Sequence, residues 1–293
     1  MSRREHRVLG WLFTSPYLLY SLVFFLIPLC WAMYLAFSDW NLISPVYNMV
    51  GLGNFKKALE NPGVRSAFWV TYKFMAFFVP IVVTGSLLVS LLVNSLPRYK
   101  SLFLVGYFLP YLASGVATSL VVKGVLSYNS PLNEWLRGSW NLTIDWLGSP
   151  VSALLIVAVI IAWKFIGYYS LILTSGLESI PTEVYEAAAI DGVTGWSRFW
   201  RITLPMLYPA LFTVLILSAG VTFGIFTEVY ILTKGGPDNA TNTWQMEIFT
   251  QAFSKLDAGY GSAIAILASV VTFASIYVIR KLMEKWGDRY GWE

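Results

Sequence analysis

The chain has few of the residues on which catalytic and metal sites depend. Its 293 residues include one histidine, His6, and one cysteine, Cys30. A single cysteine excludes an intrachain disulfide, and a single histidine in the N-terminal segment excludes a His-based metal site or a Ser-His-Asp triad in the apolar runs. Charge is scarce too, because 12% of the residues are Asp, Glu, Lys or Arg, against about 25% in a typical soluble domain. The chain therefore lacks the polar surface of a soluble globule.

Hydrophobic sequence takes the place of the missing charge. Hydrophobic residues make up 57% of the chain, and the mean hydropathy is +0.62. Helices of about 20 residues cross a bilayer, whereas barrel strands are much shorter. Six apolar runs reach that length: 9–37, 67–93, 102–126, 151–175, 209–232 and 260–279. The sequence therefore predicts an all-α, polytopic membrane protein with six transmembrane helices and without a metal site.

Lys and Arg predict the orientation of these helices. They are more frequent in the segments on the N-terminal side of the membrane than in the longer loops opposite, so we expect both termini in the cytoplasm. The same topology explains the net charge of +4 without a nucleic-acid partner. The first run is too long for a signal peptide and is expected to be an uncleaved anchor helix, kinked at Pro28.

The expected domain organisation follows from these runs. Residues 1–66 would hold the anchor helix and the first outer loop, residues 67–282 the transmembrane core, and residues 283–293 a cytoplasmic tail. The core includes a polar cytoplasmic loop, 177–208, between the fourth and fifth runs.

This polar loop has the pattern of two short helices. Pro181 suits the first turn of the first helix, Glu183 favours its positive end, and Gly192 can take the left-handed conformation that ends it. A second helical stretch, 196–204, is expected to stop at Pro205. By physics alone, such a loop is either an interfacial connection or a surface offered to a partner.

A sequence signature decides between the two interpretations of the loop. Glu186-Ala187-Ala188, then Gly192, then Ile202-x-Leu204-Pro205 resembles the signature of ATP-binding-cassette (ABC) importer permeases. The stretches 51–55 (GLGNF) and 232–237 (LTKGGP) are similar to those of carbohydrate-importer permeases of the maltose and glycerol-phosphate type. The resemblance covers nearly the whole chain and implies the type I ABC importer permease fold in a bacterial or archaeal plasma membrane.

The resemblance also implies partners and roles. Glu186 would pair with a basic residue of an ATPase subunit, Ala187 and Ala188 would pack closely against it, and Gly192 would form the turn. The implied partners are an ATPase dimer, a second homologous permease, an extracytoplasmic solute-binding protein and a carbohydrate substrate. ATP and Mg would bind to the ATPase, so this chain is expected to need no cofactor and to be no enzyme.

The apolar runs contain one residue that is costly in a membrane. Lys164 lies in the middle of the fourth run, with Tyr168 one turn later. We expect the charge to face a polar cavity, the alternative being that it snorkels to the interface. Counted from Glu186, four positions match those that line the sugar pocket in maltose-type permeases. The resemblance thus implies that the substrate pathway is lined by Lys164, Tyr168, Ser218 and Thr222. Ser and Thr in a membrane helix also bond to their own helix backbone.

The sequence alone leaves open the charge of the substrate and some other classes of function. Lys164 leaves room for an anionic sugar, and Glu228 could meet the binding protein, pair with the second permease, or be a solvated carboxylate. A membrane enzyme lacks support because the chain has no cluster of convergent acids and no phosphate-binding glycine loop. The remaining alternative is an ion-coupled secondary transporter or channel acting without an ATPase.

Overall fold

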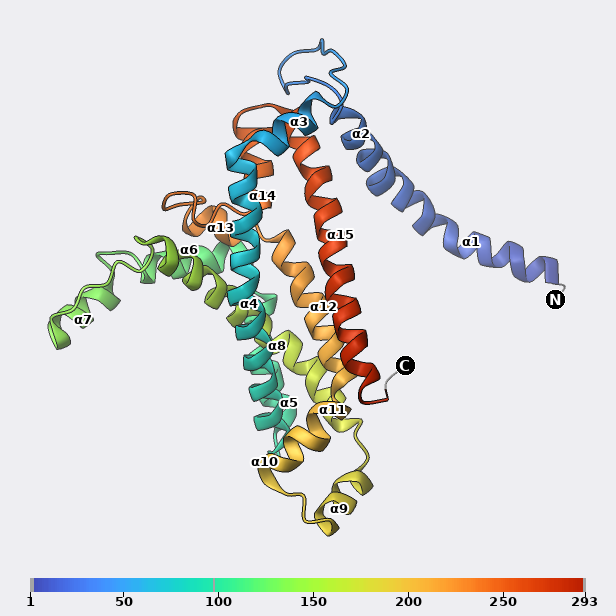
Figure 1. Ribbon diagram of the computed structural model, residues 1–293, viewed down its shortest axis with the longest axis vertical. Helices are drawn as coiled ribbons and strands as arrows, with labels where there is room; N and C mark the ends of the chain where they lie inside the picture. Colours follow the sequence, from blue (N-terminus) through green and yellow to red (C-terminus); the bar gives the residue numbers. More distant parts are fainter. Residues whose placement is uncertain (1–2, 97, 292–293) are drawn as a thin grey trace. The chain divides into compact units, whose positions relative to one another are not determined.

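Figure 1 shows a computed structural model that describes residues 3–96 and 98–291. Within these ranges the regular structure is helical, and pairing of extended backbone is limited to two isolated β-bridges. The helices before the polar loop are α1 (Arg3–Ser21), α2 (Ile27–Leu35), α3 (Gly53–Glu60), α4 (Pro62–Asn94), α5 (Lys100–Leu112), α6 (Gly115–Val125), α7 (Pro131–Trp140) and α8 (Pro150–Glu178). Those from the polar loop onward are α9 (Thr182–Ile190), α10 (Gly195–Arg198), α11 (Leu204–Met206), α12 (Tyr208–Gly224), α13 (Thr227–Leu232), α14 (Trp244–Phe249) and α15 (Ala258–Asp288). Three π-helical turns join some of them: η1 (Leu22–Leu26), η2 (Phe199–Thr203) and η3 (Thr250–Ser254).

The chain divides into two compact units. The first consists of Met1–Val64 with Glu247–Ser269, and the second of Arg65–Met246 with Val270–Glu293. Residues 247–269, which the sequence-based division assigned to the core, therefore belong to the same unit as the N-terminal residues.

The first unit has a small core of its own around α3. Ala58 and Val64 pack with Tyr260 and Ile264, and the Asn61 side chain donates a hydrogen bond to the Tyr260 hydroxyl at 2.9 Å. The most apolar stretch of α1 to α2 is 6% buried in this chain. These two helices are thus held by few contacts with the described residues of the chain.

Helix α8 is the centre of the second unit. Half of its most apolar stretch is buried, and its buried side chains share a core with α4 and α12. Gly167 lets the backbone of α5 come close, since a Cβ at that position would overlap the Tyr107 carbonyl. Gly176 does the same for α12, because its Cβ would lie 2.6 Å from Ala210. Small residues at helix contacts are typical of packing in membranes.

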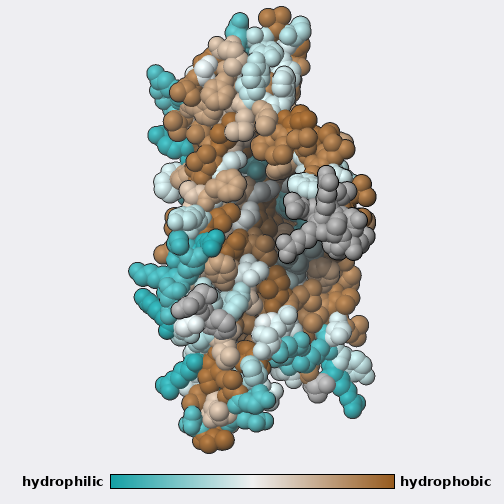
Figure 2. Space-filling model, turned by 90° about the vertical axis from the view of Figure 1, so that its right-hand side faces the viewer, coloured by the Kyte–Doolittle hydropathy of each residue, from teal (hydrophilic) through white to brown (hydrophobic). Residues whose placement is uncertain are grey.

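Among the described residues, four helices are long and apolar enough to cross a membrane, and the number rises to six if each of two bent helix pairs is one span. The four are Leu9–Leu35, Pro62–Asn94, Pro150–Glu178 and Ala258–Asp288. Figure 2 shows broad apolar areas on the face that it presents. The prediction of an all-α polytopic membrane protein is thus confirmed, with corrections to individual spans.

The third predicted run is not one continuous helix. Helix α5 ends at Leu112, α6 begins at Gly115, and the two meet at 90°. Pro110 in the last turn of α5 has no N–H to continue the ladder, and Ala113 is extended. The predicted run over 102–126 is therefore helical along most of its length, but it is divided into two helices by a bend.

The fifth predicted run is broken as well. Helix α12 ends at Gly224, Ile225 is extended, and the short helix α13 follows. The Thr243 hydroxyl donates to the Ile225 carbonyl at 3.1 Å, so the backbone oxygen at the break is satisfied by a side chain. The sequence of the run gives no sign of this distant partner.

A π-helical turn adjusts the first run at its proline. The turn η1 ends directly before Ile27, and Pro28 stands in the first turn of α2. Proline cannot donate to the carbonyl one turn back, and a wider π-helical turn is one way in which a helix absorbs this loss.

Candidate functional site

Helix α9 is closed by the glycine that the sequence singled out. Gly192 has φ +73°, its N–H bonds to the Ala189 carbonyl at 3.1 Å, and the Val193 N–H bonds to the Ala188 carbonyl at 2.8 Å. These two bonds form a Schellman motif, which satisfies carbonyls at a helix C-terminus and needs a left-handed residue. At the other end Pro181 precedes the helix, and Glu183 lies in its first turn. The predicted ends of this helix are confirmed within one or two residues.

The two alanines predicted to share a contact face are separated by the structure. Ala187 is exposed, as is Glu186, whereas Ala188 is 4% exposed and packs against the chain itself. The exposed side of α9 also carries Ile190, which is 87% exposed. A partner could therefore reach Glu186 and Ala187 directly, while Ala188 anchors the helix to its own subunit.

The second half of the polar loop ends close to the predicted position. Helix α10 continues through η2 into α11, which ends at Met206, and α12 leaves it at an angle of 69°. The predicted stop at Pro205 is thus confirmed within one residue. Exposed aromatic rings line this half, with Trp196 74% and Trp200 51% exposed.

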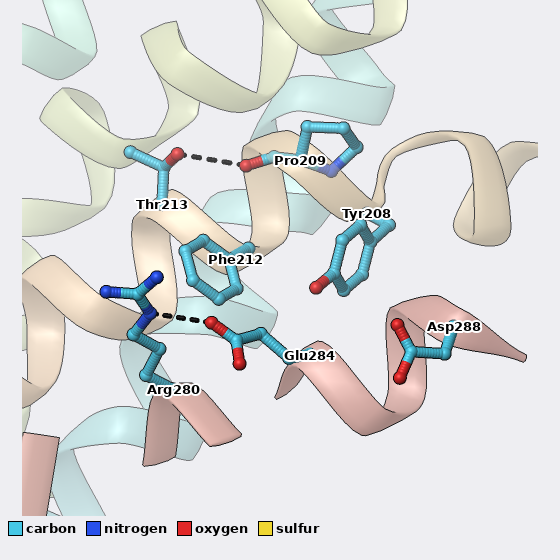
Figure 3. Close-up of a pocket in the computed structure, with 7 residues that line it drawn as sticks. All are labelled: Tyr208, Pro209, Phe212, Thr213, Arg280, Glu284 and Asp288. Carbon is cyan, nitrogen blue, oxygen red and sulfur yellow. Dashed lines mark hydrogen bonds and ion pairs between the residues drawn. The ribbon is translucent and has the colours of Figure 1, made fainter. Parts of the chain in front are cut away.

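The polar loop leads into a pocket at the start of α12 (Figure 3). Its volume is about 630 Å³, and its lining residues are Tyr208, Pro209, Phe212, Thr213, Arg280, Glu284 and Asp288. The Tyr208 hydroxyl donates to the Met283 carbonyl at 3.1 Å, which ties the start of α12 to the end of α15. On α15, Arg280 Nε and Glu284 Oε1 are 2.6 Å apart. The exit of the loop is thus braced against the last helix.

Lys164 on α8 is buried and paired. Its side-chain nitrogen lies 2.8 Å from Glu228 Oε1 on α13, and the two residues are 7% and 9% exposed. Glu228 is therefore not a solvated carboxylate, because it is buried and pairs with a lysine of its own chain. One signal in the sequence could have indicated the contact, since a buried lysine needs a counter-charge and Glu228 lies in the next apolar run.

Tyr168, one turn after Lys164, belongs to an aromatic stack. Its ring lies parallel to that of Tyr111, with 4.7 Å between centroids, and Tyr111 also contacts Phe165 edge-on. Tyr168 and Tyr111 are both partly exposed. Parallel aromatic rings with one open side can stack on the apolar face of a ligand ring.

Ser218 and Thr222 fit the alternative interpretation, in which their hydroxyls bond to the backbone of their own helix. Both are fully buried; Ser218 Oγ donates to the Leu215 carbonyl and Thr222 Oγ1 to the Ser218 carbonyl, each at 3.1 Å. Their hydroxyls thus bond to their own helix in this structure. Lys164 and Tyr168 share α8, while Ser218 and Thr222 sit on α12, which packs beside it.

Comparisons with known proteins identify the family of this chain. Residues 50–286 match the family model of the binding-protein-dependent transport system inner membrane component. The chain belongs to this family. It is a multi-pass permease subunit of a binding-protein-dependent importer and not itself an enzyme, since the ATPase of such importers is a separate subunit.

Curated relatives of the permease align along most of its length. The lactose transport system permease protein of Rhizobium radiobacter is 31% identical over 289 residues, with 95% of this chain and 96% of the relative covered. The multiple sugar-binding transport system permease protein of Streptococcus mutans is 29% identical, with 89% and 90% covered. The trehalose/maltose transport system permease protein of Thermococcus litoralis is also 29% identical, with 94% and 93% covered.

A solved structure shares the fold of the permease. A bacterial ABC transporter involved in the import of the acidic polysaccharide alginate superposes with a TM-score of 0.83, at 20% identity and with 96% of each chain covered. A second structure of the alginate transporter, in complex with a periplasmic protein that holds an alginate pentasaccharide, gives a TM-score of 0.84 at 19% identity, with 97% of this chain and 96% of that chain covered.

Proposed function

We propose that this permease is one half of a translocation pathway for a carbohydrate, driven by an ATPase dimer that docks on α9. The second half would be a homologous permease, and a solute-binding protein outside would deliver the substrate. ATP and Mg would bind to the ATPase subunits, so the permease itself would hold no cofactor. The relatives that carry sugars in their names support the carbohydrate class, and their organisms support a bacterial or archaeal plasma membrane.

The exposed part of α9 is the observation that carries this proposal. A nine-residue helix stands between α8 and α12, two of the most apolar segments of the chain, with Glu186 and Ala187 exposed. The small side chain of Ala187 lets another backbone approach, and Glu186 offers a charge to a cation of the ATPase. The cytoplasmic excess of Lys and Arg supports placing both termini and this helix on the side where ATP is available.

Alternating access would follow from rigid coupling. ATP-driven closure of the ATPase dimer would displace α9, and buried Ala188 would transmit the displacement to the helices that α9 packs against. The Schellman motif at Gly192 keeps α9 short, and Tyr208 braces the exit of the loop against α15. The residues proposed for the pathway are Lys164 and Tyr168 on α8 and, if the helices part during transport, Ser218 and Thr222 on α12.

Isolation of the tagged permease from its native membranes tests the proposal. Mass spectrometry is expected to find a second permease and an ATPase in the purified complex. After reconstitution with the binding protein, uptake of labelled lactose or maltose should require ATP. A permease that purifies alone and moves sugar without ATP would instead be a secondary transporter or channel.

A substitution at Ala187 tests the docking face. We expect Ala187→Trp to reduce the amount of co-purified ATPase about tenfold or more. A bulky side chain at the centre of a close contact weakens that contact by roughly 1–3 kcal/mol. Ser139→Trp, at an exposed position of α7, serves as the control and should retain the ATPase. Equal ATPase recovery in both variants would argue against docking on α9.

A further inference from the structure

The ion pair between Lys164 and Glu228 lies far from either end of α8. Lys164 is at the midpoint of this helix, Pro150–Glu178, so each end is about 20 Å away at a rise of about 1.5 Å per residue. A lysine side chain cannot span that distance to reach the membrane surface. The charge must therefore be compensated where it is, and Glu228 at 2.8 Å compensates it.

Three helices meet at this pair. Lys164 comes from α8, Glu228 from the first turn of α13, and Gly115 from the first residue of α6. A Cβ at Gly115 would lie 3.0 Å from Glu228 Oε1 and 3.3 Å from Lys164 Nζ, so the glycine leaves room for the two charged groups. Further along the same contact, Lys123 on α6 donates to the Ile231 carbonyl on α13 at 2.9 Å.

Two of these helices begin directly after a break in a membrane segment. Helix α6 follows the 90° bend after α5, and α13 follows the extended residue Ile225. The ion pair thus joins the start of α13 to the continuous helix α8, and the start of α6 lies beside the pair. Two separate breaks brought to one buried pair indicate a built arrangement rather than a chance surface contact.

The pair also decides what a ligand beside Lys164 would meet. A carboxylate that approached the lysine would meet a charge that Glu228 already neutralises, and the two carboxylates would repel each other at close range. A hydroxyl group can bond to the rim of the pair and leave it intact. Two opposite charges at 2.8 Å present a dipole, and sugar hydroxyls are both donors and acceptors.

We propose that Glu228 is a specificity-determining residue: as the counter-ion of Lys164 it makes the substrate pathway neutral, so that the permease accepts uncharged, hydroxyl-rich solutes and rejects carboxylated ones. This inference rests on the proposed function, in which Lys164 borders the pathway. It argues against the anionic sugar for which Lys164, considered alone, left room. The shared fold of the alginate transporter leaves this choice open, because substrate charge is selected by side chains rather than by the fold.

Glucose and glucuronate form a matched pair of probes, since they differ by a carboxylate. The importer, reconstituted with its binding protein, takes up labelled lactose or maltose while one of the two probes is enclosed in the vesicle. The enclosed probe enters the pathway from the cytoplasmic side without the binding protein, and the readout is the concentration that halves the uptake rate. In the wild type, glucuronate should inhibit no better than glucose.

Variants of Lys164 and Glu228 then distinguish an effect of charge on inhibition from an effect on the structure of the permease. In Glu228→Gln the half-inhibiting concentration of glucuronate should fall by about tenfold or more, because an uncompensated lysine attracts anions, while that of glucose should change little. Glu228→Asp keeps the charge and should behave as the wild type. Lys164→Met/Glu228→Gln removes both charges and should lose the sensitivity to glucuronate.

Two results would overturn the inference: stronger inhibition of the wild type by glucuronate than by glucose, or an unchanged response in Glu228→Gln. The comparison of the two probes on the wild type decides the matter even if Glu228→Gln fails to assemble. Failure of the proposed function is a different result, since the wild type would then show no ATP-dependent uptake with any binding protein.

Discussion

The polar loop around α9 and the buried contact of α6, α8 and α13 are built in opposite ways. The loop lies at one end of α8 and is exposed, and neighbouring residues in the sequence determine its shape, as Ala188, Gly192 and Val193 illustrate. The buried contact lies near the middle of α8 and joins Lys164 to a residue 64 positions away. Local backbone chemistry shapes the first region, and long-range electrostatics shapes the second.

This difference determines how each region responds to substitution. A surface helix that ends in a left-handed glycine tolerates changes of charge but depends on one backbone conformation. A buried ion pair tolerates a change of both partners but is damaged by the loss of one. Substitutions in the two regions should therefore produce different kinds of defect, and these can be measured separately.

Replacement of Gly192 should have the largest effect. Gly192→Pro removes the N–H that bonds to Ala189 and forces φ to about −65°, far from +73°. We expect the loss of ATP hydrolysis stimulated by the loaded binding protein, with normal insertion of the permease in the membrane. Asparagine tolerates the left-handed conformation, so Gly192→Asn should keep most of the activity and Gly192→Ala should be intermediate. Full coupling in Gly192→Pro would contradict the role of this turn.

Crowding at Gly115 should have an intermediate effect. The side chain of Gly115→Leu would push Glu228 and Lys164 apart, and we expect about 1–3 kcal/mol of destabilisation, the usual cost of overpacking. Uptake should fall and the unfolding temperature of the purified complex should drop by a few degrees. Gly124→Leu lies on the same helix with open space around it, and it is the matched control. Equal stability of the two variants would show that the pair tolerates separation.

The ion pair at the C-terminal end of α8, close to the polar loop, should matter least. Lys100 and Glu178 are 3.7 Å apart, and their side chains are 37% and 55% exposed. Exposed pairs contribute about 0–1 kcal/mol, so Glu178→Gln should shift the unfolding temperature by no more than about 2 °C. Lys164→Met, which leaves Glu228 buried and alone, is the comparison and should lower it clearly more. Similar shifts in both variants would remove the distinction between exposed and buried pairs on α8.

The sequence predicted the local features well and the long-range ones poorly. Pro181 and Gly192 have strong backbone preferences of their own, so the ends of α9 could be predicted from these single residues. The break at Ile225 depends on a distant group, because the Ile225 carbonyl is satisfied by Thr243, which lies outside the apolar run. Hydropathy measures the length of a run and is blind to such a partner.

The candidate site residues show the same difference between local and long-range features. Lys164 stood out because a lone charge is costly in lipid, but its pairing with Glu228 depends on the break before α13, which the sequence did not reveal. Ala187 and Ala188 are the same residue type, and they differ in burial because one side of α9 packs against the chain and the other is exposed. Roles that follow from residue type were predictable, whereas roles that follow from orientation required the structure.

The pairing of Lys164 has a further consequence in an energised membrane. Moving one elementary charge through the whole field costs about 2.3 kcal/mol per 100 mV. A lone lysine on a helix that shifts during transport would make the shift sensitive to the membrane potential. Because Glu228 lies 2.8 Å away and belongs to the same contact, the two charges would move together and carry no net charge. We therefore expect Lys164 and Glu228 to add no voltage dependence to the reorientation proposed for this permease.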